Sequence, residues 1–105
     1  MIKVIVNPGV CGLTTEIKAD SKDHQNSDVT IETACPFIKK IGEELKSVDG
    51  YKEIFAKYGD STVYELAAKH CKHASCPVPS GILKAIEAAC GLALPRDVEM
   101  KITKE

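Results

Sequence analysis

Cysteine stands directly before proline at two places in this chain, Cys35-Pro36 and Cys76-Pro77, and each pair opens a predicted helix. Proline is well tolerated at the first helical position, because the N–H that it lacks has no intrahelical partner there. Each cysteine is therefore predicted at a helix N-cap, where free backbone N–H groups and the helix dipole favour negative charge. Such an environment lowers the pKa of a thiol and improves it as a nucleophile or metal ligand. The repeated pattern indicates sulfur chemistry.

A thiolate site for zinc or an iron–sulfur cluster is the first interpretation, since such sites usually need four ligands. The three central candidates are Cys11, Cys35 and Cys76, and the fourth ligand is Cys71 or His73. Cys11 follows Gly9 in a predicted loop and precedes Gly12. The chain has five cysteines, an odd number that does not suit a disulfide framework in a reducing cytoplasm. The fifth, Cys90, lies near a predicted helix end after two alanines and is expected to fill the core.

A reactive thiol is the second interpretation. The run Cys76-Pro77-Val78-Pro79 resembles the Cys-Pro-x-Pro motif of the small sulfur-carrier proteins related to bacterial sulfurtransferases, over residues 76–90. That resemblance implies that Cys76 is the catalytic thiol, which takes up a persulfide and passes the sulfur on. It also implies a two-layer α/β sandwich in which the motif opens a helix. The chain as a whole looks like one of the small uncharacterised prokaryotic families.

A structural or interaction protein with buried thiols and no cofactor is the third interpretation, because free cysteine is among the most buried residue types. Its partner would be another protein that the sequence does not identify. The residue types also leave open whether the chain is an enzyme. His73 is the histidine expected to act as base or ligand, whereas His70 is expected to be a partly buried core residue and His24 a solvated one.

Composition limits the class of protein. The 105 residues are enough for one domain, residues 1–105, and the net charge is only −1, from 14 basic and 15 acidic side chains. This balance gives no sign of a nucleic-acid or anionic-membrane partner. No apolar run is long enough to cross a bilayer, and the first residues are too soon interrupted by Asn7-Pro8 for a signal peptide. We therefore expect a cytoplasmic protein.

The elements that must position these cysteines follow from hydrophobic periodicity. Apolar residues alternate with polar ones in three N-terminal segments and one C-terminal segment, which predicts strands at 2–6, 13–19, 29–33 and 98–103. Spacings of three and four predict helices at 36–48, 51–58, 62–70 and 77–90. This order predicts an α+β fold, with a four-stranded, mainly antiparallel sheet and three to four helices packed on one face.

The alternation of chain direction then predicts where the cysteines lie. If the first strand runs up, the loop with Cys11 is at the top, and so is Cys35 after the third strand. If the 36–48 helix descends and residues 51–70 ascend, the loop from Cys71 to Cys76 also reaches the top. Cys90 is then left at the bottom.

Overall fold

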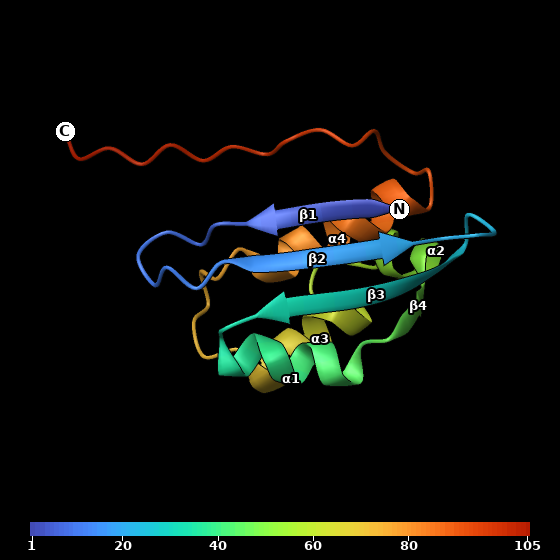
Figure 1. The fold of residues 1–105 in the computed structure, drawn as a ribbon, viewed down its shortest axis with the longest axis horizontal. Coiled ribbons are helices and arrows are strands. Elements are labelled where there is room, and N and C mark those ends of the chain that lie inside the picture. Colours follow the sequence, from blue (N-terminus) through green and yellow to red (C-terminus); the bar gives the residue numbers. More distant parts are fainter.

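An open antiparallel sheet with helices on one face forms the domain (Figure 1). The computed structural model describes all residues from 1 to 105. The sheet has the strand order β1-β2-β3-β4. Its strands are β1 (Ile2–Val6), β2 (Thr15–Asp20), β3 (Asn26–Thr33) and β4 (Ser47–Asp49), and the helices are α1 (Pro36–Glu44), α2 (Gly50–Ile54), α3 (Thr62–His70) and α4 (Val78–Ala89). The predicted α+β class, the four-stranded sheet and the helices on one face are confirmed.

Strand register follows from which side chains are apolar. Ile17 of β2 lies between Val4 of β1 and Ile31 of β3, and Ala19 lies beside Val29 of β3. Ile17, Ala19 and Val29 are buried on the face that the helices cover. A shift of one residue would turn this whole set to the outer face, so burial fixes the register.

The helix layer rests on the sheet mainly through α4, which packs on β1 and β2, and α1, which packs on β3. The third helix, α3, packs against both α1 and α4. Fourteen buried hydrophobic residues form one cluster between the two layers. None of the helices has the length and apolar character that crossing a membrane requires.

The fourth strand is not the one predicted. Residues 98–103 form no strand, and β4 occupies the edge of the sheet beside β3. The predicted 36–48 helix ends at Glu44, because Val48 is drawn into an extended segment where it is buried in the core. The Asp49 carboxylate then accepts hydrogen bonds from the backbone N–H groups of Tyr51 and Lys52 and begins α2. A spacing of three residues from Leu45 to Val48 fits a helix, so periodicity could not reveal this change.

Two side chains cap the start of α3. Ser61 accepts a hydrogen bond from the N–H of Tyr64. Glu53 of α2 is buried, and its two carboxylate oxygens accept from the N–H groups of Thr62 and Val63 at 3.0 and 2.9 Å. A carboxylate in this position satisfies donors that a helix leaves free and complements the helix dipole. Glu53 therefore helps to fix where α3 begins.

Replacing Glu53 by Ala is expected to lower the free energy of unfolding by about 1–3 kcal/mol, because the buried N–H of Val63 and the partly buried N–H of Thr62 lose their acceptor. Chemical denaturation followed by circular dichroism measures the change. The matched control is Glu65→Ala, which removes an exposed carboxylate from the first turn of the same helix. An equal effect of the two substitutions would contradict the capping role.

Candidate cysteine site

Three connections lie at one end of the sheet (Figure 1). Val6 pairs with Thr15 and Thr15 pairs with Thr33, so the loop of residues 7–14 and the turn into α1 leave the sheet at the same edge. The start of α4 lies at this end too, because a Cβ built on Gly81 would be 2.5 Å from Val6 Cγ2. The α3–α4 loop therefore reaches the same end of the sheet, as the alternation of chain direction predicts.

Three thiols from two separate parts of the chain come together there. Cys35, Cys71 and Cys76 are half-buried and pack against the edge of the hydrophobic core. Cys71 and Cys35 both lie near enough to Cys76 to raise the pKa of its thiol. Thiolate is the form of cysteine that acts as a nucleophile or as a metal ligand. Three neighbouring cysteines therefore suit both the metal site and the reactive thiol that the sequence suggests.

Cys35 is held by the strand that precedes it. Its N–H donates to Thr33 Oγ1 at 3.1 Å, and the hydroxyls of Thr33 and Thr15 hydrogen-bond to each other at 2.8 Å. Thr15 is fully buried, so this pair of hydroxyls anchors the backbone of Cys35 to the interior of the sheet. No sequence pattern indicates this role, because threonine is an ordinary strand residue. As predicted, Cys35 is the N-cap of α1 with Pro36 at the first position, and its side chain makes no capping hydrogen bond.

Cys71 and Cys76 are held around the carbonyl of His73. Cys71 is the C-cap of α3, and its N–H donates to Ala67 O. Its thiol lies 3.7 Å from His73 O, to which it donates, and the Cys76 N–H donates to the same oxygen at 3.1 Å. The backbone of His73 thus joins the two cysteines, whereas its side chain is exposed.

The pKa of the Cys76 thiol is raised above its ordinary value, mainly because burial disfavours the thiolate. Neighbouring Cys71 and Cys35 raise this pKa further, and a hydrogen bond from the N–H of Val78 opposes the rise. The lowered pKa expected for a thiol at a helix N-cap is therefore wrong for Cys76. Pro77 is the N-cap of α4, so Cys76 stands one residue farther from the helix end than predicted.

Cys11 lies in the exposed part of the β1–β2 loop. Gly9 and Gly12 both have positive φ, of 93° and 68°, and the N–H of Gly12 donates to Gly9 O, which forms a turn around Cys11. No group of three or more histidine, cysteine, aspartate or glutamate side chains is arranged to hold a metal ion. The structure therefore brings Cys35, Cys71 and Cys76 into one neighbourhood without converging them on a common point, and leaves Cys11 and the His73 ring exposed.

Cys90 lies apart from this group, at the C-cap of α4, and is 2% exposed. Its thiol donates to Gln25 O at 3.6 Å and packs so closely on Gly50 that any side chain there would collide with it. The prediction that Cys90 fills the core is confirmed.

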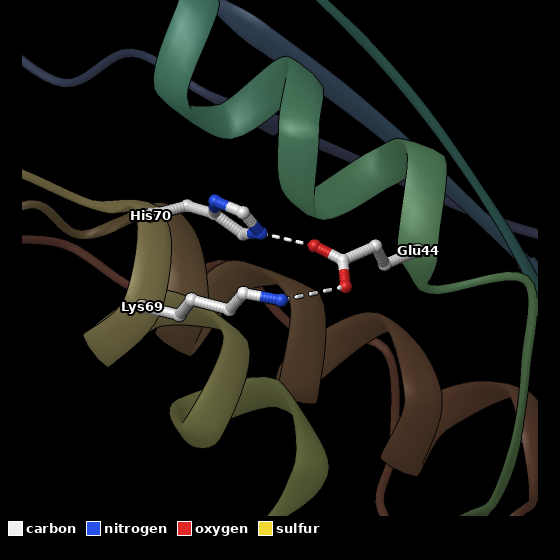
Figure 2. A network of polar contacts seen from close by, with 3 residues as sticks. All are labelled: Glu44, Lys69 and His70. Atoms are coloured by element: carbon white, nitrogen blue, oxygen red, sulfur yellow. Dashed lines mark hydrogen bonds and ion pairs between the residues drawn. The ribbon is translucent and has the colours of Figure 1, made fainter.

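His70 is engaged by an ion pair near the end of α3 (Figure 2). Its Nε2 bonds to one carboxylate oxygen of Glu44 on α1, and Lys69 Nζ lies 3.2 Å from the other. The His70 side chain is only 14% exposed, which agrees with its prediction as a partly buried residue. His70 and then Lys69 lower the pKa of the Glu44 carboxyl, because hydrogen bonds and positive charge favour its ionised form. This contact ties α1 to α3 and so steadies the position of Cys71.

Comparison with known proteins gives a family but no activity. The model of a family described as "Family of unknown function (DUF6951)" matches residues 2–102. No curated protein and no solved structure matches the chain.

We expect the metal-free protein to be alkylated slowly at Cys76 at pH 7, because the raised pKa leaves little thiolate. The rate, measured by peptide mass spectrometry with iodoacetamide, should rise with a midpoint above the value of about 8.5 typical of a free cysteine. Replacing Cys71 by Ala removes one neighbouring thiol and should move this midpoint down. A Cys76 midpoint well below that of a free thiol would contradict the environment described.

We expect Glu44→Gln to destabilise the fold at neutral pH, with an effect that depends on pH. The folded state depresses the pKa of Glu44, so its contribution is present above the ordinary carboxyl pKa of 4.5 and is lost as the pH falls through the lower folded value. Denaturation at a series of pH values should show the difference between wild type and variant shrinking toward acid. Glu43→Gln, an exposed neighbour, is the control, and a difference that does not change with pH would exclude the ion pair as its cause.

Proposed function

For this chain, which belongs to the DUF6951 family, we propose that thiolates at the end of the sheet bind a metal ion, zinc or the iron of an iron–sulfur cluster. The observation that carries the proposal is the gathering of Cys35 with Cys71 and Cys76, which lie together in a connection remote from it in sequence. The fourth cysteine at this end, Cys11, belongs to an adjoining loop. Thiolate is the ligand that zinc and iron–sulfur clusters have in common.

Electrostatics favours a cation at this position. Clustered thiols repel one another when ionised, and this repulsion contributes to the raised pKa of Cys76. A bound cation would reverse the effect, because it stabilises all the surrounding thiolates together. The N-termini of α1 and α4 also carry no side-chain caps, so their backbone N–H groups are free to stabilise negative charge on sulfur.

Binding requires modest rearrangement of the side chains. Rotation of cysteine about its Cα–Cβ bond is fast and inexpensive, so Cys35, Cys71 and Cys76 can turn toward one ion. Cys11 is the better fourth ligand for a cluster, because its glycine-flanked turn is exposed and lies at the same end of the sheet. His73 is the alternative fourth ligand, and it suits zinc because imidazole is a common zinc ligand.

The cellular setting that fits this proposal is the cytoplasm. All five cysteines are free thiols, which is the state that a reducing compartment maintains. The near-neutral charge gives no reason to propose nucleic acid as a partner. A protein that supplies the metal or sulfur, or receives it, is the kind of partner that the proposal implies.

Anaerobic purification followed by metal analysis and a visible absorption spectrum tests the proposal. The protein should contain zinc, or iron with sulfide and a brown colour, or should take one of them up on reconstitution. Zinc binding at pH 7 should release protons, because Cys76 is protonated beforehand. Replacing Cys35, Cys71 or Cys76 by Ala should abolish binding, whereas Cys90→Ala, at the opposite end, should preserve it.

A protein that stays colourless and metal-free after reconstitution would overturn the proposal, and so would equal loss in the Cys90 variant. The sulfur-carrier alternative predicts instead that Cys76 of the metal-free protein takes the outer sulfur of a donor persulfide, which leaves as a thiol, and that this transfer depends on no other cysteine. The structural alternative predicts that Cys35→Ala and Cys76→Ala change only the free energy of unfolding.

A further inference from the structure

The C-terminal segment of residues 94–105 makes no use of its backbone hydrogen-bonding groups. Gly91, with φ of 74°, and the hydrogen bond from Leu92 N–H to Glu87 O end α4 and turn the chain outward. No backbone hydrogen bond involves any residue after Leu92. Figure 1 shows the segment passing along the β1 side of the domain and ending beyond the tip of β1, outside the body of the molecule. Its own domain therefore leaves it extended and unpaired.

The sequence of this segment is nevertheless that of a strand. Val98, Met100 and Ile102 alternate with Glu99, Lys101 and Thr103. The three apolar side chains are 64%, 74% and 92% exposed. Alternation of this kind is typical of a strand with one buried face, and three large apolar side chains in a row are not expected on a free surface. The segment therefore has the sequence of a strand but no neighbouring strand to pair with.

An acceptor for such a strand exists at the edge of the sheet. β1 pairs with β2 on one side only, so the other side presents free N–H and C=O groups. On its core face Ile2, Val4 and Val6 are only partly buried. On its outer face Lys3 is exposed and lies 3.6 Å from Glu16 of β2. An added strand would cover the apolar side chains and could place an acidic residue next to Lys3.

The C-terminal segment fits this edge in charge and in pattern. With Glu99 opposite Lys3, Val98 and Met100 fall beside Ile2 and Val4 on the core face, whether the added strand is parallel or antiparallel. On the outer face Lys3, which pairs with Lys18 in the register and lies 3.6 Å from Glu16, then gains Glu99 as a second carboxylate neighbour. The ion pair that Glu99 makes within its own chain is with Lys101, and both side chains are largely exposed.

We propose that the edge strand β1 binds the C-terminal segment of a second copy of this chain, and that two copies exchange these segments in a symmetric dimer. The second copy is the favoured partner because the segment matches the β1 edge in charge and apolar pattern, yet it passes its own β1 without a hydrogen bond. A twofold exchange closes both free edges at once, since each copy gives one strand and accepts one. The candidate cysteine site plays no part in this contact.

Sedimentation velocity at low to high micromolar concentration tests the exchange. The full chain should sediment as a dimer, and a chain ending at Ala93 should sediment as a monomer with an unchanged circular dichroism spectrum in the helical region. The double substitution Val98→Asp and Met100→Asp should also give a monomer, because it would place carboxylates on the core face. Thr103→Asp, on the opposite face of the segment, is the matched control and should remain dimeric.

A charge exchange tests the register. Lys3→Glu should weaken the dimer by about tenfold, because like charges face each other twice in a symmetric pair. Adding Glu99→Lys to the same chain should restore the dimer. A full chain that is monomeric at every concentration would overturn the proposal. This includes a monomer in which hydrogen exchange shows the C-terminal amides protected, because the segment would then pair with β1 of its own chain. A dimer that survives truncation at Ala93 would overturn it as well.

Discussion

Close packing of α4 on the β1–β2 pair is the contact on which the rest of the structure depends. Gly81 permits this contact, since a Cβ there would overlap Val6 and touch Ile17. With Gly81 in place, Ile82, Ala85 and Ile86 are buried completely against the sheet. The same contact determines where α4 begins, and therefore where Cys76 stands relative to the strands that lead to Cys11 and Cys35.

Polar side chains, of which Glu53 and Ser61 are buried, then position the remaining helices. Glu53 and Ser61 cap α3, the Asp49 carboxylate begins α2, and Glu44 links α1 to the end of α3. No buried side-chain nitrogen or oxygen lacks a hydrogen-bond partner. Because α3 is anchored at both ends, Cys71 at its C-cap has a defined position beside Cys76. The clustering of the three thiols thus results from the placement of the helices and not from a short sequence motif.

The two ends of the domain use cysteine differently. Cys90 is enclosed by Gly50 and the backbone of Gln25, and it has room for no ligand. Cys35, Cys71 and Cys76 are instead half-buried, adjoin an exposed loop and lie near two uncapped helix N-termini. Burial raises the pKa of Cys76, and a hydrogen bond from a backbone N–H opposes this rise. The same residue type therefore serves packing in one place and is available for chemistry in the other.

By itself the sequence determined the fold class, the first three strands, the helices in outline and the burial of Cys90 and His70, because hydrophobic period and local caps act over a few residues. Alternation of strand direction also sufficed to predict which connections share one end of the sheet. Only the tertiary structure decided that Val48 belongs to a strand and that residues 98–103 do not, since a strand exists only where a neighbour accepts its hydrogen bonds. The raised pKa of Cys76 likewise depends on burial and on Cys71 and Cys35, whose distances no local pattern contains.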